Sequence, residues 1–179
     1  MRFIVWVAPL LATIVAANPK ISLSDLQWTV SNNNNASIPG NFPSQAHLDL
    51  YRAGIIEDPL YGFNDVDQLW VQRSNWTWST QSIKNLSTES DTQTWLIFEG
   101  LDTFAEVKLC DEVVANTNNM YRQYSIDVTD TLRKCSGSPD LSINFGSASK
   151  IVLDIAKTGP GKRLLGRPVT TNLLTNTSL

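Results

Sequence analysis

Apolar and polar side chains alternate within residues 94–128, and this pattern constrains the fold more than any other feature of the chain. The apolar positions are Ala105, Val107 and Leu109 in one segment and Tyr124, Ile126 and Val128 in another. Successive side chains of a β-strand point to opposite faces, so a period of two indicates strands with one buried face. Residues 95–98 are apolar throughout, which predicts a central strand covered on both sides.

Short connections and further strands complete an antiparallel arrangement. The corner at Cys110, Asp111 and Glu112 lies between two strand-like segments and predicts a tight hairpin. More strands are expected at residues 26–30, 76–83, 140–145 and 151–155. One helix is expected at residues 44–54, with Ser44 as its cap and Gly54 at its end. The sequence therefore predicts an all-β fold, a jelly-roll β-sandwich with one short helix.

The first residues have the layout of a secretory signal peptide. Arg2 precedes an uncharged apolar segment, residues 3–15, and small residues follow before Asn18. Such a signal peptide would direct the chain to the extracellular space or to a lysosome-like or vacuole-like compartment. Its cleavage after residue 17 would leave no membrane attachment. The alternatives are a buried N-terminal strand or a membrane anchor.

Two further features agree with export. Four Asn-x-Ser/Thr sequons make N-glycans an expectation, at Asn35, Asn75, Asn85 and Asn176. Cys110 and Cys135 are the only cysteines. In an oxidising compartment such a pair favours a disulfide, whereas the alternative is two unpaired thiols.

Few residues suggest chemistry. His47 is the only histidine, and without other ligands at a suitable spacing it predicts a structural or surface role and no metal site. Trp76 and Trp78 alternate with polar residues, which favours core packing over stacking on a sugar. No cofactor motif or paired catalytic carboxylates are present, and without a basic patch carrying aromatics nucleic-acid binding has no support.

One polar segment could bind a carbohydrate. Asn64, Asp65, Asp67 and Trp70 are expected in one loop, where the indole could stack on a sugar and the carboxylates accept from its hydroxyl groups. The competing interpretation is a solvated loop with a buried tryptophan.

The C-terminal segment differs in character from the rest. Residues 157–179 contain four basic residues, no acidic ones and no helical or strand period. We expect a folded domain at residues 18–156, followed by a disordered tail that is foreign to the domain.

The body resembles the galactose-binding-like N-terminal domain of secreted β-mannosidases of glycoside hydrolase family two. The matching segments are Ile38-Pro39-Gly40, Leu48 with Gly54-Ile55-Ile56, Asp58-Pro59-Leu60-Tyr61, Phe63-Asn64, Leu69-Trp70-Val71, Asn75-Trp76-Thr77, Phe98-Glu99-Gly100-Leu101-Asp102-Thr103, Asn119-Met120-Tyr121 and Tyr124-Ser125-Ile126-Asp127-Val128-Thr129. Together they extend from about residue 26 to residue 155.

This resemblance implies an enzyme that removes terminal non-reducing β-D-mannose with retention, using two glutamates in a downstream (β/α)₈ barrel. Such a barrel takes about 250 residues and does not fit after residue 155, so no catalytic residue is assigned in this sequence. The Trp-Asp-Trp-Gly segment of the family is also missing from it. The resemblance implies a mannoside or mannan oligosaccharide as substrate and docking of this domain on the barrel.

We expect this fragment to be inactive alone. The alternatives are a stand-alone secreted carbohydrate-binding module and a fragment that does not fold stably.

Overall fold

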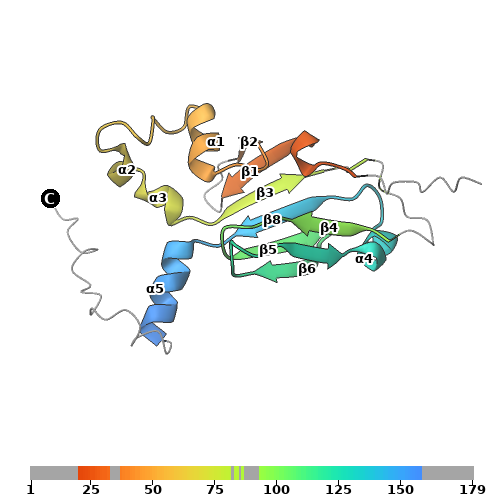
Figure 1. The fold of residues 1–179 in the computed structure, drawn as a ribbon. Coiled ribbons are helices and arrows are strands. Elements are labelled where there is room, and N and C mark those ends of the chain that lie inside the picture. Colours follow the sequence, from red (N-terminus) through yellow and green to blue (C-terminus); the bar gives the residue numbers. More distant parts are fainter. Residues whose placement is uncertain (1–19, 33–36, 82, 85, 87–92, 159–179) are drawn as a thin grey trace, which may run out of the picture.

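The computed structural model describes residues 20–32, 37–81, 83–84, 86 and 93–158, which form a β-sandwich of two unequal antiparallel sheets with short helices at its ends (Figure 1). The larger sheet has six strands in the order β2-β1-β3-β8-β5-β6, and the smaller sheet pairs β4 with β7. The strands are β1 (Trp28–Asn32), β2 (Ser37–Gly40), β3 (Trp76–Thr80), β4 (Trp95–Phe98), β5 (Ala105–Leu109), β6 (Glu112–Thr117), β7 (Tyr124–Asp127) and β8 (Leu141–Phe145). The predicted all-β jelly-roll sandwich is confirmed.

One face of the larger sheet is the core. The register places Val30 opposite Trp78, Trp78 opposite Ile143 and Ile143 opposite Val107, so four neighbouring strands contribute one row of buried side chains. On the same strands Thr77, Ser79, Ser142 and Lys108 occupy the alternate positions and face outward. A period of two therefore separates a buried apolar face from a polar one, as the sequence predicted.

The smaller sheet forms the second layer. Phe98 and Val128 are buried, and Leu96 and Ile126 pack partly against the same core. Trp95 and Ile97 instead lie on the outer face and are half exposed. The prediction of a central strand covered on both sides was wrong for residues 95–98, because β4 has only one strand partner and its second apolar face has no cover among the described residues.

The predicted hairpin corner is confirmed. Cys110 and Asp111 link β5 to β6, and both have positive φ angles, 51° and 63°. Two consecutive left-handed residues are the geometry of a type I′ turn, whose twist matches that of the flanking strands. The structure also joins the sulfurs of Cys110 and Cys135 in a disulfide, which ties the end of β5 to the end of α4 (Thr129–Lys134).

The prediction of a single helix was wrong. The segment predicted to be helical forms α1 (Ala46–Arg52), and its neighbour Gly54 has φ 68°. The Ser44 hydroxyl donates to the Asp49 carboxylate and does not cap the backbone. Besides α1 and α4 the described residues contain a 3₁₀ turn, two one-turn helices and a longer C-terminal helix: η1 (Leu23–Asp25), α2 (Asn64–Asp67), α3 (Leu69–Gln72) and α5 (Ala148–Thr158).

Residues 151–155 belong to α5 and do not form the predicted strand. Short apolar runs suit both states, and here the polar positions Lys150, Asp154 and Lys157 have helical spacing. The helix passes the expected domain boundary by two residues, Lys157 and Thr158. The predicted leader, residues 1–17, and residues 159–179 of the predicted tail lie outside the described residues. No described helix is long and apolar enough to span a bilayer.

Candidate functional site

The residues predicted to bind a sugar lie on two consecutive helical turns at one end of the sandwich, not in a loop. Asn64, Asp65 and Asp67 lie on α2 and Trp70 lies on α3. The Asn64 side-chain amide is occupied, because it donates to the Asp58 carbonyl at 2.8 Å. The Asp65 and Asp67 carboxylates face solvent.

Trp70 is only partly available for stacking. Its indole is 39% exposed, and its ring centroid lies 6.0 Å from that of Trp76 at an interplanar angle of 46°. Trp76 and Trp78 are each 5% exposed, which confirms core packing for both. Their indole N–H groups donate to the Val71 carbonyl and to the Asp49 carboxylate.

The same end of the molecule exposes large apolar side chains. We call residues 55–70 the apolar arm, because six large apolar side chains within it are exposed: Ile55, Leu60, Tyr61, Phe63, Val66 and Trp70. Leu60 is 95% exposed and Phe63 is 80% exposed. Scattered apolar residues are ordinary on a surface, whereas six within one short segment make this part of the surface a candidate for contact with another surface.

The apolar arm is held in shape by polar contacts. The Asp58 carboxylate accepts from the Leu60 N–H at 2.9 Å, and the Asp58 carbonyl accepts from the Tyr61 N–H and from the Asn64 amide. The Gln68 amide N–H donates to the Glu57 carbonyl at 3.0 Å. These bonds fold the segment back on itself and hold it in one defined shape, with its apolar side chains exposed.

Gln68 has an unusual acceptor. The residue is 7% exposed, and no hydrogen-bond donor among the described residues reaches its buried Oε1 atom. Buried acceptors are normally paired, so a donor from outside the described residues would suit this position.

Asp49, which the sequence pattern did not single out, fixes the base of the apolar arm. It is 1% exposed, and its two carboxylate oxygens accept from the Trp78 indole, the Ser44 hydroxyl and both the backbone and side-chain amides of Asn41. The Arg52 guanidinium lies 3.5 Å from Oδ1. Asp49 therefore joins α1 to β3 and to the chain that follows β2, and α1 leads directly into the arm. The available signal was a carboxylate flanked by two leucines in the middle of a helix.

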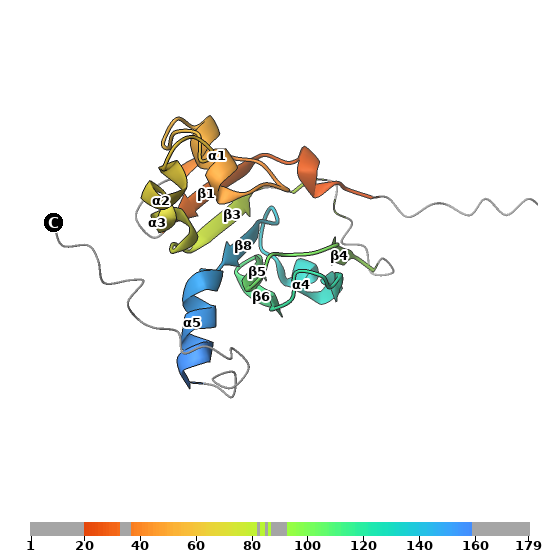
Figure 2. The ribbon, with the colours of Figure 1, turned by 60° about the vertical axis from the view of Figure 1, so that its left-hand side comes forward.

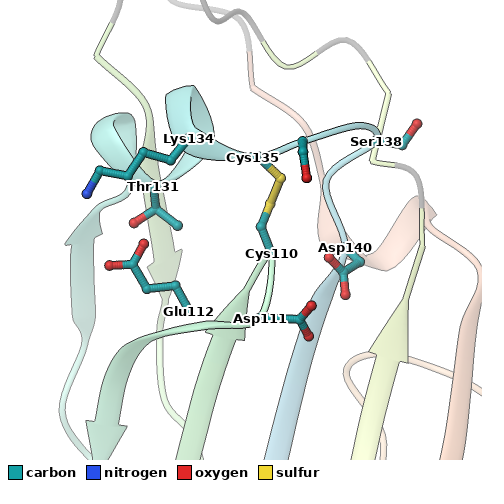
Figure 3. A pocket seen from close by; sticks show the side chains of 9 residues that line it. Cys110, Asp111, Glu112, Thr131, Lys134, Cys135, Ser138 and Asp140 are labelled. Carbon is teal, nitrogen blue, oxygen red and sulfur yellow. A yellow bond between two sulfur atoms is a disulfide. The ribbon is translucent and has the colours of Figure 1, made fainter.

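A second polar site lies near the disulfide (Figure 3). A shallow hollow of about 140 Å³ is lined by the disulfide and by charged side chains from the β5–β6 turn, α4 and the chain before β8. Asp111, Glu112 and Asp140 contribute carboxylates, and Lys134 contributes an amine. Among the described residues no three histidine, cysteine, aspartate or glutamate side chains come together as a metal-binding group.

Shifted pKa values have local causes. Hydrogen bonds from the side chain and backbone of Thr129 hold the pKa of Asp127 below its usual value. Partial desolvation lowers the pKa of His47, which lies half-buried on α1. Neither group belongs to a carboxylate pair of the kind that retaining glycoside hydrolysis needs.

One of the four sequons can be placed. Asn75 is exposed immediately before β3, and its Oδ1 accepts from the Ser147 N–H at 2.9 Å. Asn35, Asn85 and Asn176 lie outside the described residues.

Comparison with known proteins identifies the family. Residues 28–173 match the glycosyl hydrolase 2 galactose-binding domain-like family, so the match includes all eight strands and α5. The chain belongs to this family. The match also extends into the segment that the sequence suggested was foreign to the domain, and that boundary stays a prediction.

Similar sequences within this glycosyl hydrolase 2 family include β-mannosidase A of Emericella nidulans, which is 48% identical over 137 residues, 76% of this chain and 14% of the relative. β-Mannosidase A of Aspergillus terreus is 48% identical over 141 residues, 78% of this chain and 15% of the relative. The chain therefore spans about one seventh of the length of these curated relatives.

Solved structures agree with this assignment. The crystal structure of a β-D-mannosidase from Dictyoglomus thermophilum matches with a TM-score of 0.68 and 28% identity, over 75% of this chain and 16% of that one. The exo-chitosanase of Amycolatopsis orientalis has a TM-score of 0.52 and 17% identity, which shows the galactose-binding-like fold alone.

Proposed function

We propose that this chain is the non-catalytic N-terminal domain of a β-mannosidase that hydrolyses terminal non-reducing β-D-mannose residues. The observation that carries the proposal is the 48% identity to β-mannosidase A of Emericella nidulans, combined with a match to only 14% of that relative. Most of such a relative lies outside the matched region, and the catalytic chemistry belongs there in this proposal.

The apolar arm is the surface on which this domain would dock against the catalytic part. Leu60, Tyr61 and Phe63 are at least three-quarters exposed, and the contacts of Asp58 and Asn64 hold the segment that carries them in a defined shape. Burying such side chains contributes about 1.5–3 kcal/mol each. Polar groups at the edge of the arm, such as Asp65 and Asp67, would remain in water.

A stand-alone carbohydrate-binding module is the second candidate. Trp70 is partly exposed on the turn that follows Asp65 and Asp67, so an indole and two carboxylates occur close together in the chain. Stacking on the indole with hydroxyl groups donating to the carboxylates is the chemistry by which such a surface would hold a sugar.

Three measurements separate these functions. The purified chain should not hydrolyse a chromogenic β-mannoside, and it should show no heat of binding with mannobiose. A chimera of the Emericella nidulans enzyme that carries residues 28–173 of this chain in place of its own matching region should hydrolyse the substrate. Hydrolysis by the isolated chain would contradict the non-catalytic role. Saturable mannobiose binding that Trp70→Ala abolishes, together with an inactive chimera, would favour the binding module.

We propose further that the chain is secreted as a glycoprotein. The supporting observations are the leader-like residues 1–17, the four sequons and the pairing of Cys110 with Cys135. N-terminal sequencing of protein from the culture medium should begin at Asn18, and an endoglycosidase should lower its apparent mass. Retention in the cell with an intact Met1 would contradict the proposal.

A further inference from the structure

The C-terminal helix α5 has an apolar face without a partner among the described residues. Figures 1 and 2 show the helix projecting away from both sheets. None of its residues is buried, and Val152 and Ile155 are each 50% exposed. Lys150, Asp154 and Lys157 occupy the other side, so the apolar face carries no charge. A helix of 11 residues is marginal in water by itself, so its stability depends on covering this face.

The start of α5 is fixed to the end of α3, just beyond the apolar arm. The Ser147 hydroxyl donates to the Gln72 carbonyl at 2.7 Å, and the Ser149 hydroxyl reaches the same carbonyl at 3.2 Å. The Ser147 N–H donates to Asn75. These bonds connect the start of α5 to the end of α3 and to Asn75 before β3. Both views place α5 and the α2–α3 turns at the end of the sandwich opposite α4 (Figures 1 and 2).

We propose that the apolar face of α5 is a second docking surface for the part of the β-mannosidase that lies beyond this domain. This inference rests on the function proposed above and adds a separate surface to the apolar arm. The bound surface should be apolar, because Ile151, Val152 and Ile155 offer no charge to pair.

The position of α5 in the chain identifies the occupant. The described chain ends with this helix, and the family match ends at residue 173, whereas the β-mannosidase relatives are about seven times as long as the matched region. In such a relative the polypeptide continues from the C-terminal end of α5 into the rest of the enzyme. The rest of such an enzyme is therefore the occupant that the chain length favours for the exposed helix face, which lies at the same end of the sandwich as the arm (Figures 1 and 2).

The test compares two pairs of substitutions on opposite sides of α5. V152Q with I155Q removes the apolar face, and K150Q with K157Q is the control on the polar side. Glutamine has about the helix propensity of lysine and a slightly higher one than valine or isoleucine, so neither pair weakens the helix through propensity. Each pair is made in the isolated chain and in the chimera with the Emericella nidulans enzyme, and thermal unfolding and limited proteolysis after residue 158 are measured in both.

We expect V152Q with I155Q to leave the melting temperature of the isolated chain within about 1 °C of the parent, because both side chains already face water. In the chimera the same pair should lower the melting temperature by about 4 °C or more and speed cleavage beyond α5, whereas the control pair should do neither. An unchanged chimera would overturn the proposal.

Other occupants give different results. Destabilisation of the isolated chain by V152Q with I155Q would mean that residues 159–179 cover the helix, and a concentration-dependent dimer lost in this variant would mean that a second copy does. Either result overturns the proposal. If the parent chimera is active and V152Q with I155Q changes neither its melting temperature nor its proteolysis, the proposed function stands and only the docking role of α5 is refuted. An inactive parent chimera removes both.

Discussion

Replacing Asp49 by alanine should destabilise the domain far more than removal of any exposed carboxylate. Asp49 is 1% exposed and accepts hydrogen bonds from five donors on Asn41, Ser44, Arg52 and Trp78. The Trp78 indole is 5% exposed, so its N–H would lose its acceptor in a buried place, at a cost of about 1–3 kcal/mol.

The other donors lie closer to water and can find a solvent acceptor, so they add about 1 kcal/mol in total. The expected loss in the free energy of unfolding is therefore about 3 kcal/mol, which corresponds to a fall in melting temperature of roughly 6–12 °C for a domain of this size. Asp49→Asn should cost about half as much, because the amide retains one acceptor oxygen but directs an NH₂ group at the donors.

Chemical denaturation followed by tryptophan fluorescence measures these differences directly, and Trp78 itself lies beside the changed residue. Asp65→Ala, on exposed α2, is the matched control and should change the free energy by no more than about 0.5 kcal/mol. Equal unfolding midpoints for Asp49→Ala and Asp65→Ala would refute the assignment of Asp49 as the anchor of α1.

Three further changes test other parts of the structure. Replacing both Cys110 and Cys135 by serine opens a loop with a sequence separation of 25 and should lower the free energy of unfolding by about 3.5 kcal/mol in urea titrations; equal midpoints for oxidised and reduced parent would contradict this. Gly100→Ala should cost roughly 1–3 kcal/mol in the same titration, because a Cβ there would lie 2.4 Å from the Met120 carbonyl oxygen, and an unchanged midpoint would argue against this close approach. The folded-state pKa of His47 lies below its ordinary value of 6.5, so the contribution of the neutral imidazole to stability is present above pH 6.5 and is lost as the pH falls through the folded-state pKa. His47→Gln should therefore reduce the loss of stability between pH 7.5 and 5.5. An equal loss in the parent and the variant would exclude the effect.

The fold was largely predictable because its core strands keep a strict period of two. Val107 and Leu109 have the alternation that a one-sided sheet requires, and the turn at Cys110 and Asp111 follows from the short gap between two such strands. The prediction for residues 95–98 was wrong because a strand that is apolar on both faces has two interpretations. It can be a central strand, or a strand whose second face lacks a cover in the described chain. Periodicity does not distinguish the two.

The candidate site was less predictable because its organisation depends on contacts between distant residues. Trp78 reaches Asp49 across 29 positions, and Ser147 reaches Gln72 across 75. Asp65 and Trp70 are exposed, but they lie on helical turns and not in the predicted loop, because local bonds such as that between the Asn64 amide and the Asp58 carbonyl form these turns. The apolar arm consists of single exposed side chains that no periodic pattern marks.

The place of β8 in the larger sheet has a consequence for how the domain is made. β8 lies between β3 and β5, so the centre of the sheet is closed by a strand that leaves the ribosome more than 60 residues after β3. Contacts this distant in sequence slow folding, and until β8 arrives both β3 and β5 keep an unpaired edge. During synthesis the nascent domain should therefore bind chaperones and stay open to proteolysis and self-association until Phe145 has emerged. The larger sheet should then form in one late step, when β8 pairs with β3 and β5.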